Sequence, residues 1–251
     1  MLVDVHAHLY LDQFSKDIDE VIVRAKKSGV VSIINSGTDH DSNITVLKLA
    51  EKYDICNATL GIYPTDAMKL TKAELDKEIE FIKSKKDKIV GIGEIGLDFH
   101  LTKEKNDHEK QIKAFRHIIT SLKDIGLTFV IHSRKAEKEC IDILEESKIK
   151  NVVFHCFTGK FSLVKRIQQN NWSASIPANI DKSHHFQGMV DILSINNILT
   201  ETDAPFLTPA GEERSESSFI RGTIKKIAEI KKMEEDEVEK NIYLNYQKLF
   251  T

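Results

Sequence analysis

The stretch Thr-Phe-Val-Ile-His, residues 128–132, places a histidine directly after a run of apolar residues. The stretch Asn-Val-Val-Phe-His, residues 151–155, repeats the same arrangement farther along the chain. Both runs are rich in Val, Ile and Phe, which is typical of a β-strand that is covered on both faces. We therefore predict two neighbouring buried strands, each with a histidine where the strand ends.

Similar apolar runs recur along the whole chain, and amphipathic stretches separate them. Eight runs are predicted to be strands: Leu2–Val5, Val31–Asn35, Asn57–Ile62, Ile89–Gly93, Thr128–Ile131, Asn151–Phe154, Trp172–Ile176 and Asn197–Glu201. Within Glu104–Lys123, apolar residues recur at the spacing of one helix face: Ile112, Phe115, Ile119 and Leu122. Alternating strands and helices indicate parallel strands that are joined by crossover helices.

Eight such units favour a closed barrel over an open sheet. The chain has 251 residues, and a (β/α)8 TIM barrel typically needs about 250. We predict an α/β fold of this type, with residues 1–251 forming a single domain.

Charge, hydrophobicity and cysteine content limit the classes of function that this chain can have. The formal net charge is −3, so a nucleic-acid partner would have to be held by a local site. We see no signal peptide and no apolar run of the roughly 20 residues that a membrane span needs. The three cysteines are widely spaced, which suits a reducing compartment. We expect a cytoplasmic protein that does not enter a membrane, and a monomer is favoured.

Six residues that can bind metals stand at the predicted strand ends: His6, His8, Glu94, His132, His155 and Asp203. Residues two apart on a strand point to the same side, so His6 and His8 can present two imidazoles to one metal. A lone histidine after a strand is more often a hydrogen-bonded core residue, and Asp203 could simply cap a helix. Glu94 lies among glycines, and a buried carboxylate is costly unless it is paired or bound to a metal.

Together, the six residues indicate a site for metal ions, whereas each of them alone has a simpler explanation. Four imidazoles and two carboxylates can hold two divalent ions about 3.5–4 Å apart, with one carboxylate bridging them. Mixed nitrogen and oxygen ligands suit Zn, Mn, Fe or Mg, of which Mg has the lowest preference for nitrogen ligands. Such a pair of ions lowers the pKa of a bound water toward ~7 and so supports hydrolysis near neutral pH.

Five motifs in a fixed order resemble the TatD family of metal-dependent deoxyribonucleases. They are His-x-His at 6–8, Gly-Glu-Ile-Gly-Leu-Asp at 93–98, Ile-His-Ser-Arg at 131–134, His-Cys-Phe-Thr-Gly at 155–159 and Glu-Thr-Asp-Ala-Pro at 201–205. The resemblance runs from residue 4 to about residue 216, and the C-terminal helices also fit it. It implies a barrel of the metallo-dependent hydrolase type that cleaves DNA phosphodiester bonds, often from the 3′ end of single strands.

The resemblance also implies roles for individual residues. One metal (Zn, Mg or Mn) would be bound by His6, His8 and Asp203, and a second by His132 and His155. Glu94 would bridge the two ions, and Asp203 would also orient or deprotonate the attacking water. The guanidinium of Arg134 is suited to hold a phosphate by paired hydrogen bonds.

Two motifs depart from the family. Residues 61–65 read Gly-Ile-Tyr-Pro-Thr, where the family commonly has Gly-Ile-His-Pro-His. Tyr63 and Thr65 can hydrogen-bond to a phosphate or a base, but they cannot act as imidazole acids. The late motif Arg-Asn-Glu-Pro becomes Arg-Ser-Glu-Ser at 214–217, which keeps Arg214 and Glu216. No metal-ligand position is lost.

We therefore predict a metal-dependent deoxyribonuclease, a 3′–5′ exonuclease on single-stranded DNA. The first alternative is a small-molecule amidohydrolase or lactonase on the same barrel. Many such relatives bridge their metals through a carboxylated lysine, whereas Glu94 takes that place here. The second alternative is a non-enzymatic nucleic-acid binder, which would leave the predicted cluster of buried histidines and carboxylates without a role.

Overall fold

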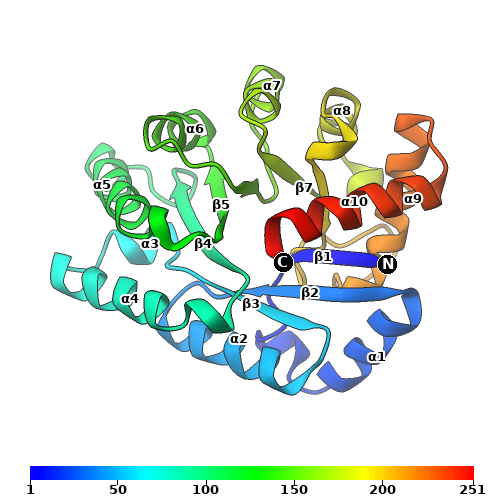
Figure 1. Cartoon of the computed structure of the whole chain (residues 1–251), viewed down its shortest axis with the longest axis horizontal. Coiled ribbons are helices and arrows are strands. Elements are labelled where there is room, and N and C mark those ends of the chain that lie inside the picture. Colours follow the sequence, from blue (N-terminus) through cyan, green and yellow to red (C-terminus); the bar gives the residue numbers. More distant parts are fainter.

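Eight parallel strands pair in chain order and curl into a nearly closed barrel, in a computed structural model that describes residues 1–251 (Figure 1). The strands are β1 (Leu2–Ala7), β2 (Val30–Ser36), β3 (Cys56–Leu60), β4 (Gly91–Asp98), β5 (Thr128–Arg134), β6 (Val152–Phe154), β7 (Ser173–Pro177) and β8 (Ile198–Glu201). Each strand faces the barrel core on one side and the surrounding helices on the other (Figure 1), which accounts for the apolar runs on which the prediction rested. The predicted (β/α)8 fold is confirmed.

Helices surround the barrel and cover the outer faces of its strands (Figure 1). They are α1 (Ile18–Ser28), α2 (His40–Lys52), α3 (Pro64–Ala67), α4 (Lys72–Ser84), α5 (Lys105–Leu122), α6 (Glu137–Glu146), α7 (Phe161–Gln169), α8 (His184–Ile192), α9 (Ile220–Lys231) and α10 (Glu235–Phe250). The predicted apolar stripe of α5 is confirmed, because Phe115, Ile119 and Leu122 are buried. None of the helices is both long enough and apolar enough to cross a bilayer.

The seam between β8 and β1 closes near the carboxyl ends of the two strands. Two backbone hydrogen bonds cross it, from His8 N to Ala204 O at 2.8 Å and from Asp203 N to His6 O at 2.9 Å. Farther along the seam, the buried carboxylate of Asp4 takes the place of backbone hydrogen bonds between the two strands. It accepts hydrogen bonds from the Thr202 backbone N–H at 2.9 Å and from the Thr202 hydroxyl at 2.6 Å. This seam fixes His6, His8 and Asp203 relative to one another.

Strand β4 differs from its prediction, which ended at Gly93. The strand runs to Asp98, so Glu94 lies inside it rather than at its end. Its pairing with β5 resumes after an irregularity, with Gly96 opposite His132. Gly96 has φ 143°, and a Cβ there would lie 1.9 Å from the carbonyl oxygen of His132. In the sequence, the glycines around Glu94 suggest a loop. In the structure, they lie within β4 and allow β4 and β5 to approach each other closely.

Candidate metal centre

All six predicted metal-binding residues meet at the carboxyl ends of the strands. His6 and His8 come from β1 and its end, Glu94 from β4, and His132 from β5. His155 directly follows β6, and Asp203 comes two residues after β8. The chain directions of a parallel barrel bring these ends together at one face.

The first cluster consists of four ligand atoms around one point. His6 Nε2 and His8 Nε2 are 3.2 Å apart. Glu94 Oε2 lies 3.5 Å from His6 Nε2 and 3.6 Å from His8 Nε2. Asp203 Oδ1 lies 3.6 Å and 3.4 Å from the same two nitrogens. Ligands held tetrahedrally at about 2.0–2.1 Å from one metal lie about 3.3 Å apart, and the spacings among His6, His8 and Asp203 fit such an ion.

The second cluster uses the other oxygen of the same glutamate. Glu94 Oε1 lies 2.7 Å from His132 Nδ1 and 3.0 Å from His155 Nε2. The two imidazole nitrogens are 3.1 Å apart. Three converging ligand atoms leave further coordination positions free, as in catalytic rather than structural metal sites.

Glu94 is buried, and its charge depends on the histidines around it. Burial raises the pKa of Glu94, but the neighbouring imidazoles of His155 and His132 hold that pKa well below its ordinary value. Burial lowers the pKa of His132, yet its hydrogen bonds to Asp98 and Glu94 raise it to about 9. The site thus favours a carboxylate with a positive charge next to it, and a bound cation would supply that charge in place of the imidazolium proton.

Hydrogen bonds behind the first cluster orient its imidazoles. His8 Nδ1 lies 3.0 Å from the backbone oxygen of Ser36, and His6 Nδ1 lies 3.1 Å from the Ser36 hydroxyl. That hydroxyl accepts a hydrogen bond from Thr59 Oγ1 at 3.0 Å. Partners of this kind fix which ring nitrogen faces a metal, and here Nε2 is the free nitrogen in both residues.

Asp98 is a site residue that the sequence analysis missed. Its Oδ2 lies 2.9 Å from His132 Nε2 and accepts a hydrogen bond from the Tyr63 hydroxyl at 2.8 Å. Burial raises the pKa of Asp98, but the His132 hydrogen bond and others lower it to about 2. The available signal was strand alternation, since Asp98 lies four residues after Glu94 in one strand and so faces the same side.

Glu201 and Cys156 also approach the centre. Glu201 is buried, accepts hydrogen bonds from the Ser175 hydroxyl at 2.6 Å and the Cys156 backbone N–H at 2.8 Å, and lies 3.7 Å from His155 Nδ1. Strand alternation after His155 leads to the expectation that Cys156 points away from the site, but Cys156 lines the cavity. Its φ of 42° ends the strand alternation on which that expectation depended.

A cavity of about 650 Å³ opens above the two clusters. Tyr63 and Arg134 line it, and the Arg134 side chain is exposed at the end of β5. Thr65 does not line the cavity, because Pro64 starts the short helix α3 and turns Asp66 toward the cavity instead. The structure therefore gives the predicted substrate contact of Thr65 no support.

The residues retained from the late motif lie outside this cavity. Glu216 pairs with Arg24 of α1 at 2.7 Å, and Arg214 pairs with Asp17 just before that helix. Both side chains fasten the loop after β8 to α1. Their contacts are structural and give them no place in the metal centre.

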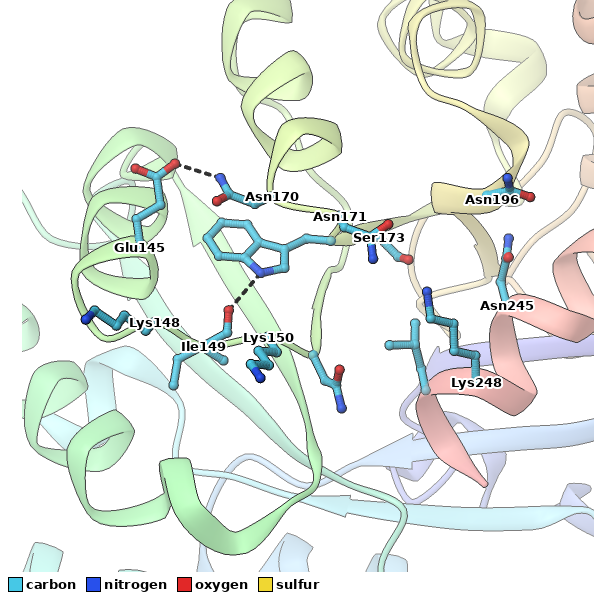
Figure 2. A pocket seen from close by; sticks show the side chains of 13 residues that line it. Glu145, Lys148, Ile149, Lys150, Asn170, Asn171, Ser173, Asn196, Asn245 and Lys248 are labelled. Atoms are coloured by element: carbon cyan, nitrogen blue, oxygen red, sulfur yellow. Dashed lines mark hydrogen bonds between the residues drawn. The ribbon is translucent and has the colours of Figure 1, made fainter.

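A second cavity, of about 510 Å³, lies at the opposite end of the barrel (Figure 2). Lysines and asparagines dominate its lining, including Lys148, Lys150 and Lys248. Its one carboxylate, Glu145, accepts a hydrogen bond from Asn170 at 2.7 Å. None of the groups of side chains that could hold a metal lies in this cavity.

Comparisons with known proteins identify related sequences along the full chain. The family described as TatD related DNase matches residues 3–251. An uncharacterized metal-dependent hydrolase of Bacillus subtilis is 34% identical, with 100% of this chain and 99% of the relative covered. A human protein named deoxyribonuclease TATDN3 is 31% identical, with 99% and 94% covered. A protein of Erwinia tasmaniensis named 3′-5′ ssDNA/RNA exonuclease TatD is 28% identical, with 99% of each chain covered.

Solved structures show the same architecture. A TatD homologue from Escherichia coli superposes with a TM-score of 0.90 and 24% sequence identity. The match covers 99% of this chain and 97% of that chain. At this identity the likeness establishes the fold alone.

Proposed function

Because this chain belongs to the TatD family of metal-dependent DNases, we propose that it hydrolyses phosphodiester bonds in DNA, from the 3′ end of single strands. The observation that carries the proposal is the position of Glu94. One of its oxygens faces His6 and His8, and the other faces His132 and His155. A carboxylate shared in this way suits two metals that clamp one phosphate.

We assign two divalent ions to these clusters, with Zn, Mg or Mn as candidates. His6, His8 and Asp203 would hold one ion, His132 and His155 the other, and Glu94 both. Bound there, the ions would lower the pKa of a bound water toward about 7 and offset the charge that develops on the phosphoryl oxygens.

Asp203 is the residue that we assign to the attacking water. Its side chain keeps 14% exposure, against 3% for Glu94, so it can reach a water in the cavity. Its backbone is held at φ 52° by the seam between β8 and β1. A carboxylate fixed at this place can orient the water and accept its proton.

Two further side chains are assigned to the phosphate. Arg134 is exposed beside His132 and forms no ion pair within the protein, so its donors are available for phosphate oxygens. Burial, with the nearby charges of Glu94 and Asp98, raises the pKa of Tyr63 far above its ordinary value. Tyr63 therefore stays a neutral hydroxyl, and it would donate its one proton to a phosphate oxygen in place of Asp98.

The preference for single strands rests on charge and on the named relatives. The net charge of −3 gives the protein little to grip a duplex with. The Erwinia relative is named as an exonuclease on single-stranded DNA and RNA. A cavity that binds one phosphate suits a strand that enters by its end.

The test is an assay of purified, metal-defined protein on labelled linear single strands, closed single-stranded circles, blunt duplex and RNA, together with a panel of lactones and amides. We expect linear single-stranded DNA to be cut faster than duplex, with circles resistant. Equal rates on circles and linear strands would refute the exonuclease assignment. Turnover of a lactone or amide without turnover of DNA would refute the nuclease.

A further inference from the structure

An exposed phenylalanine, Phe206, stands at the mouth of the metal cavity. It lines the cavity three residues after Asp203 and is 50% exposed. Its ring centroid lies 6.3 Å from that of His8, with an interplanar angle of 66°. The ring therefore borders the site where we place the scissile phosphate.

The backbone around Phe206 is held in place. Its N–H donates to Asp203 O at 2.8 Å, and the Ser215 N–H donates to Pro205 O at 3.0 Å. Ala204 forms a parallel bridge to Ala7, and its N–H donates to the Thr202 hydroxyl at 3.2 Å. The phenyl ring thus projects from a fixed support into the entrance.

A second exposed apolar side chain, Leu101, lines the same cavity. Leu101 is 58% exposed, and the Asp98 carboxylate accepts a hydrogen bond from its backbone N–H at 2.8 Å. Seven large hydrophobic residues of this chain are exposed, and these two are the ones that line the metal cavity. A half-exposed ring contributes little to folding, because most of its transfer free energy is gained only on burial.

The cavity therefore has a polar, metal-binding floor and an apolar rim. A nucleotide matches both parts, because its phosphate is charged and its base has a flat, apolar face. We propose that Phe206 stacks on the nucleobase next to the scissile phosphate. This inference rests on the proposed function and deepens it.

Stacking of this kind would explain two properties together. Every base has a π-face, so an aromatic platform can bind any sequence. A base inside a duplex already stacks on its neighbours on both faces. The terminal base of a strand has one face free, so Phe206 would select strand ends over internal positions without reading sequence.

Binding can be measured separately from hydrolysis. The probe is an oligothymidylate with 2-aminopurine as its 3′-terminal base and a phosphorothioate at the terminal linkage to slow cleavage. Stacking quenches 2-aminopurine fluorescence, and titration gives the Kd. We expect Phe206→Ala to weaken binding about tenfold and to remove the quench, while Phe206→Tyr keeps both. Phe206→Leu keeps apolar bulk but loses the flat face, so it should behave like the alanine variant.

The matched control is Phe161, which is 43% exposed but stacks on His185 at 5.3 Å and does not line the cavity. Phe161→Ala should leave binding and the quench unchanged. A second probe carries an abasic 3′-terminal nucleotide, and here wild type and Phe206→Ala should bind equally. Equal loss of affinity on both probes would overturn the inference, and so would an unchanged quench in Phe206→Ala. If the wild type cleaves no DNA, the proposed function fails, while the fluorescence result still decides the role of Phe206.

Discussion

The two ends of the barrel each carry a cavity, of about 650 Å³ and about 510 Å³, but only the one at the carboxyl end gathers side chains that could bind metals. The carboxyl end gathers four imidazoles around Glu94, whose two oxygens serve two clusters. The amino end gathers lysines and asparagines, and several of the asparagines hydrogen-bond within the fold, such as Asn245 Nδ2 to Ile198 O at 2.9 Å. A polar hollow alone therefore does not identify an active site, whereas converging ligand atoms around a buried carboxylate do.

The backbone at the two ends differs in the same way. At the amino end, Lys148 and Asn171 have positive φ because they follow the ends of α6 and α7. Hydrogen bonds from Ile149 N to Leu144 O and from Trp172 N to Ile167 O identify both as ordinary helix terminations. At the carboxyl end, Cys156 and Asp203 have positive φ two residues after the ends of β6 and β8, beside the candidate metal centre. Unusual backbone next to reactive groups is typical of functional sites.

The same substitution at each end tests this contrast most strongly. Glu94→Gln keeps the shape but removes the charge that both clusters share. We expect metal content to fall below two per chain and hydrolysis to fall at least ~100-fold, or about 2.7 kcal/mol. Glu145→Gln in the other cavity should change neither. Metal analysis and kcat/KM decide, and a fully active Glu94→Gln protein with two metals would break the assignment.

A substitution at the amino end should affect stability instead. The Trp172 indole N–H donates to Ile149 O at 3.0 Å, and the side chain is buried. Trp172→Phe leaves that carbonyl without its partner, so we expect a loss of about 2 kcal/mol in the free energy of unfolding. Denaturant titration measures this loss, and kcat/KM at low temperature should stay at the wild-type value. A fall in kcat/KM without a loss of stability would contradict the division between the two ends.

Arg134→Lys tests the proposed phosphate contact at the carboxyl end. A lysine keeps the charge but cannot bracket two phosphate oxygens with the same geometry. We expect metal content and folding to be intact and DNA turnover to fall about tenfold, in the range of a lost charge-assisted hydrogen bond. Hydrolysis of an activated small phosphodiester should fall by the same factor if Arg134 contacts the scissile phosphate. An effect on long DNA alone would assign Arg134 to a neighbouring phosphate, and no effect would remove it from the site.

The smallest effect is expected from the lysines of the amino-end cavity. Replacing Lys148, Lys150 and Lys248 together with alanine should change DNA hydrolysis less than about twofold, because surface substitutions away from a site are nearly neutral. The loss of positive charge slows DNA association in general, so the control removes three exposed lysines elsewhere: Lys123, Lys165 and Lys225. A much larger loss in the first variant than in the control would make the amino-end cavity part of the DNA-binding surface.

Much of the candidate site was predictable because its signals are local. Apolar runs followed by His6, Glu94, His132 or Asp203 can be recognised without knowing what lies across the barrel. Parallel strands joined by helices must bring their carboxyl ends to one face, so the gathering of these residues follows from the strand order. The candidate ligands and the barrel could therefore be predicted from the sequence alone.

Other features depended on contacts between segments that are distant in the chain. The role of Asp98 requires the register of β4 against β5, and the sequence suggested that β4 ended at Gly93. The exclusion of Thr65 depends on the turn into α3, and the inclusion of Cys156 on its positive φ. Strand periodicity predicts side-chain direction only while the strand continues. Beyond a strand end, the packing of neighbouring loops decides which side chains face the cavity, and only the tertiary structure contains that information.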